Sequence, residues 1–497
     1  MSAENEMKSA LKKGYLRTVG FLNFLSQARW FDWGVMAAIL TVFLCEAYSH
    51  IDYHGLWGDE AYAAHLAMQK IPEIFHVIAL VRDAPFYLLF LHFWIKVFGV
   101  SLVSIRSISV LCSAATLMLI YIFCKKNINR QTGFFACLLY IRSTFEIHYA
   151  VETRSYAMIG LFIMTALCLM FSLAHRPNWK TAVALGFIYA LIVYTHYVAV
   201  LALVTQGIAA YVLMGKYGVR FFRFYILSGI VCVALVLPWL PNILKLVAAP
   251  GESWQSIPDM GQVNDLLRFY FFNDYHKFVL AIWYSAISLL VIVLANRKML
   301  SWHYLGVFFI LAVAPVALDY FISFKAPMFV MRYMMYALVG LFLFLGYLFS
   351  LIPISPALKV LVAIISAFIF LPGAEGLGAY SNEDWQIIVP LAKAERQLHD
   401  ASESKIIIFP PYKCESFSYY WDRKIFEGPD LYKPLREQNI YGVNYPAELK
   451  QYMDPLPKEI IFINASPADF VFKKLDSAYA TSKHINSYTG VNIAIYR

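Results

Sequence analysis

Long apolar runs recur along most of this chain and limit the folds that are open to it. Such runs, of about 18 residues or more, repeat between residues 32 and 371. A helix needs about 20 apolar residues to cross the roughly 30 Å of hydrocarbon in a bilayer. Only 15% of the residues are charged, whereas a soluble globular protein carries about 25%. The sequence therefore predicts a polytopic α-helical membrane protein.

The C-terminal part of the chain has a different character. From Ala379 onward charged residues become frequent, and apolar runs shorten to segments such as 406–409 and 460–463. We expect a helix over residues 383–398, capped at Ser381, followed by short strands, which indicates an α/β domain. The sequence thus divides into a transmembrane module, residues 1–375, and a soluble domain, residues 376–497.

Basic residues lie mainly at the ends of the apolar runs, where they mark the cytoplasmic side of a membrane protein. This accounts for the net charge of +9 without a nucleic-acid partner. The basic N-terminal segment lacks the short apolar core of a removable signal peptide, so we interpret it as a retained cytoplasmic tail. Of the seven cysteines, only Cys414 lies in the soluble part, and no disulfide or zinc pattern follows.

The basic clusters also constrain the number of crossings, because an even number must separate two cytoplasmic segments. Three apolar runs, 32–50, 85–99 and 102–124, lie between the N-terminal tail and Lys125. The middle run is the shortest and contains His92 and Lys96. We therefore predict that it lies on the outer membrane surface, anchored by these two residues, within a long outer loop of about residues 49–101.

The other apolar runs pair into alternating crossings. They are residues 132–148, 155–175, 181–196, 197–214, 224–247, 278–295, 302–322, 329–351 and 358–374. With a cytoplasmic N-terminus, about eleven crossings place the C-terminal domain on the extracytoplasmic side.

Polar residues collect at the predicted outer ends of these segments. They are Asp59, Glu60, Arg82, Asp83, Glu146, His148, Glu152, Arg154, His196, Asp319, Lys325 and Arg332. Charged groups at the edge of the hydrocarbon usually face a cavity or one another, which predicts one outward-facing site. A polar side chain at a span end can also simply reach the headgroups. We favour that simpler interpretation for Glu146, Asp319 and Lys325.

Several of the other residues also have structural interpretations. Asp59 can cap a helix over residues 61–69, although capping explains one carboxylate of the Asp59-Glu60 pair and not both. Glu152 and Arg154 can form a structural ion pair as readily as Arg154 can bind phosphate. Arg332, near the start of a late span, can reach the headgroups or bind phosphate, and a lone histidine such as His196 is more often a hydrogen-bonded structural residue than a ligand.

Short motifs follow one another along the chain, each on the predicted outer side. The acidic pair Asp59-Glu60 opens the long loop, and Asp83-Ala84-Pro85 stands later in it. The stretch 148–157 contains Glu152, Arg154 and Tyr156. Tyr194-Thr195-His196-Tyr197 marks another outer turn, and Arg332-Tyr333 begins a late span.

Between about residues 33 and 351, this pattern resembles the GT-C glycosyltransferase superfamily. Within it, the chain is similar to the bacterial branch that includes protein O-mannosyltransferases, lipid A 4-amino-4-deoxy-L-arabinose transferases and lipopolysaccharide-core galacturonosyl transferases. Those enzymes begin with one span and a long outer loop that opens with an acidic pair. Where they commonly have His-Pro-Pro, this chain has Asp83-Ala84-Pro85, so any role of that histidine is absent here.

The resemblance implies an inverting glycosyltransferase at the outer face of a bacterial inner membrane. Its donor would be a polyprenyl-phosphate sugar and its acceptor a lipid, glycan or protein of the cell envelope, with membrane lipids around it. Asp59 would be the catalytic base, supported by Glu60. Arg154, Arg332 and then Arg82 would bind the donor phosphate. The remaining substrate-binding candidates are Asp83, Glu152, Tyr156, His196 and Tyr333.

The sequence names no cofactor with certainty. A nucleotide-binding loop is not needed when the donor is lipid-linked, and none is recognised. Asp59, Glu60, Glu152 and His196 could share a divalent cation, but such a site also works without metal, so both alternatives stay open. The competing class is a transporter or flippase of lipid-linked sugars, which tends to show internal repeats and polar residues near the midplane. We recognise neither feature.

Overall fold

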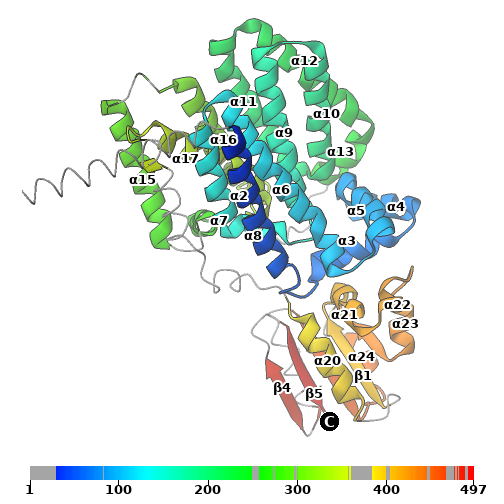
Figure 1. The fold of residues 1–497 in the computed structure, drawn as a ribbon. Helices are drawn as coiled ribbons and strands as arrows, with labels where there is room; N and C mark the ends of the chain where they lie inside the picture. Colours follow the sequence, from blue (N-terminus) through cyan, green and yellow to red (C-terminus); the bar gives the residue numbers. More distant parts are fainter. Residues whose placement is uncertain are drawn as a thin grey trace, which may run out of the picture.

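The computed structural model shows a helical bundle with a smaller domain at one end (Figure 1). It describes residues 29–81, 83–248, 257–271, 275–295, 298, 300–355, 358–359, 383–398, 403–444, 448–465, 475, 478–479, 481–486 and 491–497.

In this part of the chain, 7 helical segments are long and apolar enough to cross a membrane. They are formed by α2 (Arg29–His50), α6 (Leu102–Asn127), α9 (Tyr156–His175), η1 (Tyr197–Ala199) with α11 (Val200–Tyr217), α12 (Val219–Val236) with η2 (Leu237–Trp239) and α13 (Leu240–Ala248), α16 (Trp302–Ile322), and η4 (Met331–Met334) with α17 (Met335–Leu351). The predicted class, a polytopic helical membrane protein, is confirmed.

Several predicted spans differ from the helices observed. The run 132–148 is not one span, because it breaks at Ser143 into α7 (Arg130–Arg142) and α8 (Thr144–Ala150). The Ser143 hydroxyl accepts a hydrogen bond from the Glu146 amide at 3.4 Å and donates one to the Tyr270 carbonyl at 3.1 Å. A serine that caps a new helix is a break that hydrophobicity alone does not reveal.

Other predicted spans meet the length criterion less well. α10 (Trp179–Thr195) is apolar but shorter than these seven, whereas α15 (Tyr275–Ala295) is a helix of 21 residues that covers the predicted run 278–295. The predicted span 358–374 lies outside the described residues except for its first two.

Charge pairs at both ends of α2 show how it runs against its neighbours. At its start, Asp32 Oδ2 lies 2.5 Å from Lys125 Nζ and 3.3 Å from Arg130 Nη2. At its other end, Glu46 Oε2 lies 3.2 Å from Arg142 Nη1. α2 and α6 are therefore antiparallel, and the described residues of the connection between them, 51–81 and 83–101, lie at the bundle end opposite Lys125.

This connection forms three short helices, α3 (Gly58–Met68), α4 (Ile71–Val81) and α5 (Pro85–Phe98). With 11 and 14 residues, α4 and α5 fall short of the roughly 20 needed to span. His92 on α5 is not the interfacial anchor that the sequence suggested. It is buried, and its Nδ1 lies 2.7 Å from the Ala67 carbonyl oxygen, where it joins α5 to α3.

The C-terminal domain is α/β, as predicted. Its strands lie in the order β2-β1-β3-β5-β4, with β1 parallel to β2 and β3 and the other pairs antiparallel. The strands are β1 (Ser404–Phe409), β2 (Ile440–Gly442), β3 (Glu459–Asn464), β4 (Ser482–Asn486) and β5 (Asn492–Tyr496). The helices are α20 (Trp385–Arg396), α21 (Cys414–Trp421), α22 (Arg423–Phe426), α23 (Tyr432–Glu437) and α24 (Leu449–Tyr452). Ser381 and the predicted boundary at 375/376 lie outside the described residues.

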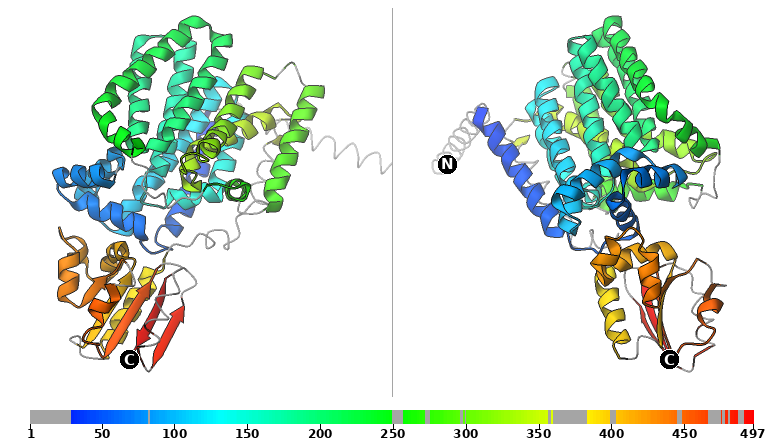
Figure 2. Two further views of the ribbon diagram at one scale, coloured as in Figure 1. Left: turned by 180° about the vertical axis from the view of Figure 1, so that it is seen from behind. Right: turned by 90° about the vertical axis from the view of Figure 1, so that its right-hand side faces the viewer.

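This domain packs directly against the outer-loop helices, and Figure 2 shows it beneath them at one end of the bundle. The Tyr420 hydroxyl accepts a hydrogen bond from the Leu56 amide at 2.8 Å, and His65 Nδ1 lies 2.8 Å from the Phe426 carbonyl oxygen. Tyr419 and Phe426 belong to the same apolar cluster as α3 and α5. The C-terminal domain and the helices of the long outer loop are therefore packed together through hydrogen bonds and a shared apolar cluster.

Candidate functional site

The acidic pair lies in the first turn of α3, where carboxylates interact favourably with the helix dipole. The helix begins at Gly58 and its N-cap is Trp57, so Asp59 is not the capping residue that the sequence suggested. The Asp59 side chain is 35% exposed, whereas the Glu60 side chain is fully buried. Neighbouring carboxylates thus face different surroundings.

Glu60 is held by a buried two-pronged ion pair with Arg106 of α6. Arg106 Nε donates to Glu60 Oε1 at 2.9 Å, and Nη2 lies 2.5 Å from Oε2. The amide of Thr153 donates to the same Oε1 at 2.6 Å. Arg106 also donates to backbone oxygens at residues 51, 54 and 55. Glu60 therefore ties α3 to α6 and to the loop after α8.

The sequence analysis missed Arg106, although one signal was present. An arginine inside a predicted span, here 102–124, costs free energy unless a partner compensates its charge. It is therefore a candidate functional or structural residue by default. A buried carboxylate in the loop that precedes the span is the natural candidate for that partner.

Asp59 is close to two arginines from distant parts of the chain. Arg332 Nη2, from η4, lies 3.6 Å from Asp59 Oδ2. Arg154 Nη1, from the loop between α8 and α9, lies 3.5 Å from the Asp59 backbone oxygen. The Arg332 guanidinium also lies 5.8 Å from the Trp57 ring centroid. One carboxylate and two guanidinium groups thus converge at the end of the bundle next to the C-terminal domain.

The possible Glu152–Arg154 ion pair does not form between the described side chains. Among the described residues, the one short charge contact of Glu152 is with His148 Nε2, at 3.9 Å. Burial, and then the nearby Glu60 charge, raise the pKa of Glu152 to about 8, against the opposing effect of Arg332 and Arg154. Arg154 is therefore not neutralised by a direct pair with Glu152.

An aromatic cluster borders these arginines. The ring centroids of His196 and Tyr333 are 4.4 Å apart, and Tyr156 lies 6.3 Å from each. The Arg154 guanidinium lies 6.0 Å from the Tyr156 centroid. Tyr156 of α9, Tyr333 of η4 and His196, which joins α10 to η1, therefore form one wall of the site, as the motif positions suggested.

Asp83 is close enough to Arg154 to interact with its charge. Its Oδ1 accepts a hydrogen bond from the Ala84 amide at 2.7 Å, and its carbonyl oxygen accepts one from the Tyr197 hydroxyl at 2.8 Å. Arg82, the third predicted phosphate ligand, lies outside the described residues.

Two residues that we expected to reach the headgroups do not. Glu146 and Asp319 are fully buried, and they accept hydrogen bonds from Tyr140 at 2.5 Å and from Ser323 at 3.1 Å. Their carboxyl groups are internal polar contacts of the bundle, so that interpretation was wrong. Lys325 is exposed.

The C-terminal domain adds residues to this site that the sequence analysis did not single out. Lys413 forms an ion pair with Glu383, and a Cβ built on Gly58 would lie 3.0 Å from Lys413 Nζ. Glu415, two residues on, is 8% exposed. Burial, and then the charge of Asp59, raise the pKa of Glu415 to about 8, and Lys413 opposes them. The domain thus brings charged groups to Asp59 itself.

The described residues were also compared with the arrangement that a metal site requires. Among the described residues, no group of three or more His, Cys, Asp and Glu side chains is arranged to hold a metal ion. Glu60, one of the suggested ligands, is already engaged by Arg106.

Comparison with known proteins places this arrangement in a fold class. The family model described as dolichyl-phosphate-mannose-protein mannosyltransferase matches residues 82–241. ArnT from Cupriavidus metallidurans in the apo state is similar with a TM-score of 0.56 and 12% sequence identity, over 93% of this chain and 98% of that chain. ArnT bound to undecaprenyl phosphate gives a TM-score of 0.55 with the same identity and coverage.

A more distant similarity extends to Archaea. The Archaeoglobus fulgidus oligosaccharyltransferase in the apo form has a TM-score of 0.50 and 10% identity, over 87% of this chain and 70% of that chain. No curated protein sequence matches the chain. The chain has the fold of the GT-C glycosyltransferases, which confirms the resemblance predicted from its motifs.

Proposed function

We propose that this protein is an inverting glycosyltransferase that moves a sugar from a polyprenyl-phosphate donor to a cell-envelope acceptor. It would work at the outer face of a bacterial inner membrane, with the C-terminal domain on the same side. The fold shared with ArnT, one structure of which contains undecaprenyl phosphate, supports the donor class. The observation that carries the proposal is the contact of Asp59 with Arg332, at 3.6 Å, beside Arg154.

Asp59 is the base in this proposal. The acceptor hydroxyl or amine loses its proton to the Asp59 carboxylate and forms a bond to the anomeric carbon. The bond from that carbon to the phosphate oxygen breaks, and the phosphate leaves with the electron pair. A single displacement of this kind inverts the configuration. Asp59 suits the role because its carboxylate is partly exposed and accessible to a substrate.

The two arginines stabilise the departing phosphate. Each guanidinium presents a planar fork that matches phosphate oxygens and keeps its positive charge. Charge that develops on the leaving group is stabilised best by donors already in place. A phosphate between Arg154 and Arg332 would also draw Arg332 away from Asp59, which leaves that carboxylate able to accept a proton.

Glu60 has a different role from the one the sequence suggested. Its oxygens are engaged by Arg106 and by the Thr153 amide. We therefore assign Glu60 to positioning the first turn of α3, and with it Asp59, rather than to proton transfer.

The proposal is tested by substituting Asp59 and measuring sugar transfer. Membranes containing the wild type or Asp59→Asn are given radiolabelled polyprenyl-phosphate sugars with lipid, glycan and peptide acceptors. Loss of a general base should slow turnover by about 10²-fold or more, at an unchanged protein level. Asp52→Asn, in an exposed residue of the same loop, is the matched control and should transfer normally. Wild-type turnover by Asp59→Asn would exclude Asp59 as the base.

A further inference from the structure

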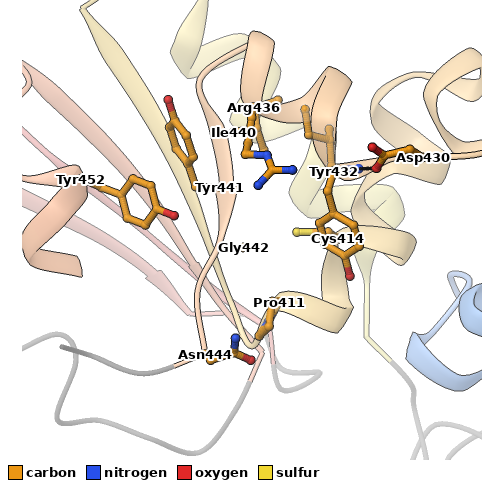
Figure 3. A pocket seen from close by; sticks show the side chains of 11 residues that line it. Pro411, Cys414, Asp430, Tyr432, Arg436, Ile440, Tyr441, Gly442, Asn444 and Tyr452 are labelled. Atoms are coloured by element: carbon orange, nitrogen blue, oxygen red, sulfur yellow. Dashed lines mark hydrogen bonds between the residues drawn. The ribbon is translucent and has the colours of Figure 1, made fainter. Parts of the chain in front are cut away.

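A cavity lies within the C-terminal domain, apart from the arginines of the proposed transfer site. Its volume of about 440 Å³ is within the range of roughly 300 to 1,000 Å³ for small-molecule sites. Figure 3 shows it around β2, with Tyr441 and Tyr452 on one side of the strand and Arg436 and Tyr432 on the other. β2 is an edge strand of the sheet, so no other strand of the described residues covers its outer side.

The side chains around this cavity combine aromatic faces with polar groups. The ring centroids of Tyr441 and Tyr452 are 4.5 Å apart, and Tyr432 is 38% exposed. Tyrosine offers an apolar face with a hydroxyl at its edge, and the Asn444 amide both donates and accepts hydrogen bonds. A pyranose ring matches this combination, because its C–H groups pack on aromatic faces while its hydroxyls need polar partners.

Arg436 gives the cavity a positive charge. Its guanidinium has no hydrogen-bond or ion-pair partner within the residues that the structure describes. Asp430, on the same side, instead accepts hydrogen bonds through Oδ1 from the amides of Tyr432 at 2.9 Å and Lys433 at 3.3 Å. The Arg436 fork is therefore available for a carboxylate or phosphate group of a ligand.

A short turn connects this cavity to the transfer site. In η5 (Pro411–Lys413), Pro411 lines the cavity, and Lys413 lies against Gly58, the residue before Asp59. Two residues of chain span at most about 7 Å. A Cβ built on Gly442 would lie 2.9 Å from both Pro411 Cβ and Cys414 Sγ, so β2 packs directly on this turn. A ligand in the cavity would therefore be separated from the first turn of α3, which carries Asp59, by the short turn η5.

We propose that the cavity binds an anionic saccharide, namely the carbohydrate part of the acceptor. The tyrosines hold the sugar rings, and Arg436 holds a phosphate or carboxylate group on them. That the saccharide is the acceptor rests on the proposed function, whereas its binding to the cavity does not.

Binding is tested with the purified full-length protein by saturation-transfer difference NMR. The observed probes are methyl α-glucoside, glucuronic acid and glucose 6-phosphate, and inorganic phosphate, which has no carbon-bound protons, is added as a competitor of glucose 6-phosphate. We expect signals from the two anionic sugars and weaker signals from the neutral one. If the competition gives inorganic phosphate a dissociation constant as low as that of glucose 6-phosphate, the cavity is a simple anion site and the saccharide assignment is overturned. The absence of binding by every sugar would overturn it too.

Substitutions of residues that line the cavity test whether the sugars bind there. Arg436→Gln should weaken glucose 6-phosphate binding by about 10- to 150-fold, the effect of losing charge-assisted hydrogen bonds. Tyr452→Ala should weaken all sugars, and Tyr452→Phe, which keeps the ring, should weaken them less. Lys433→Gln, an exposed position on the same helix outside the cavity, is the matched control. With melting temperatures unchanged, sugar binding that is equally tight in Arg436→Gln and Tyr452→Ala would overturn the proposal.

A transfer assay separates this inference from the proposed function. If the pocket variants raise the KM for acceptor and leave the KM for donor unchanged, both proposals stand. If sugars bind in the cavity but the wild type transfers no sugar, the proposed function fails and the saccharide pocket stands. If transfer is normal and the acceptor KM is unchanged in both pocket variants, the acceptor assignment of the cavity fails and the proposed function stands.

Discussion

The two ends of the helical bundle differ in whether their buried charged and polar groups have partners. At the end with Lys125, the buried charges of Asp32 and Lys359 have polar partners. Asp32 contacts Lys125 and Arg130, and Lys359 Nζ donates to Gln131 Oε1 at 3.1 Å and to the Ser350 carbonyl oxygen at 2.5 Å.

At the end that faces the C-terminal domain, buried polar atoms are left without partners. Within the described residues, the hydroxyls of Tyr62 and Tyr87 and both carboxyl oxygens of Glu152 have no hydrogen bond. Leaving such a group unsatisfied costs about 1 to 3 kcal/mol. That cost is reasonable where a substrate supplies the missing partners, so the comparison separates a structural end from a binding end.

Glu60 is the exception at the binding end, and its removal should have the largest effect on stability. Glu60→Ala leaves Arg106 buried without its partner, which should lower the free energy of unfolding by about 3 to 5 kcal/mol. The measurement is thermal unfolding of the purified protein, with Glu73→Ala, an exposed position on α4, as control. If Glu60→Gln instead kept the wild-type melting temperature and lost transfer as completely as Asp59→Asn, Glu60 would be a catalytic residue.

The arginines at the binding end should affect donor use rather than stability. In Arg154→Lys and Arg332→Lys an ammonium replaces the guanidinium fork, with a loss of about 1.5 to 3 kcal/mol, or roughly 10- to 150-fold in donor affinity. Donor titration at saturating acceptor, together with the melting temperature, measures both effects. Arg130→Lys at the opposite end should leave donor affinity unchanged. Wild-type donor affinity in both site variants would remove the phosphate assignment.

The binding end consists mostly of apolar segments, and this explains which of its functional residues could be predicted from the sequence. Charged residues are rare and costly in apolar segments, so Asp59, Arg154 and Arg332 stand out without a structure. Their convergence follows from their shared position at one end of the bundle.

Other features depend on contacts that a single sequence does not reveal. The Glu60–Arg106 pair joins α3 of the outer loop to the span α6, and only the structure shows that these two side chains meet. Lys413 and Glu415 belong to a soluble domain, where charged residues are common and none stands out. The break at Ser143 is likewise hidden in an apolar run, because one serine barely changes its hydrophobicity.

The raised pKa of Glu415, near the interface between the C-terminal domain and the bundle, predicts that the stability of the folded protein depends on pH. The pKa of Glu415 is raised from 4.5 to about 8, so the folded protein favours the protonated form. The contribution of the protonated Glu415 carboxyl to the free energy of unfolding is fully present below pH 4.5. It declines as the pH rises, because the carboxyl loses its proton, and is lost above about pH 8. Glu415→Gln should therefore show a flatter melting temperature between pH 5 and 9 than the wild type, while Glu427→Gln, at an exposed position, should follow the wild type. Parallel curves for all three proteins would show that Glu415 is not protonated in the folded state.

The smallest effect is expected at the structural end, from Lys125. Its side chain is 35% exposed, and Arg130 still contacts Asp32 when Lys125 is replaced. Partly exposed ion pairs contribute about 0 to 1 kcal/mol, so Lys125→Gln should lower the melting temperature only slightly. Donor and acceptor KM values should not change, because this residue lies at the opposite end of the bundle from Asp59. A donor defect in Lys125→Gln as large as that in Arg154→Lys would show that both ends take part in substrate binding, and the division of the bundle into a structural and a binding end would be wrong.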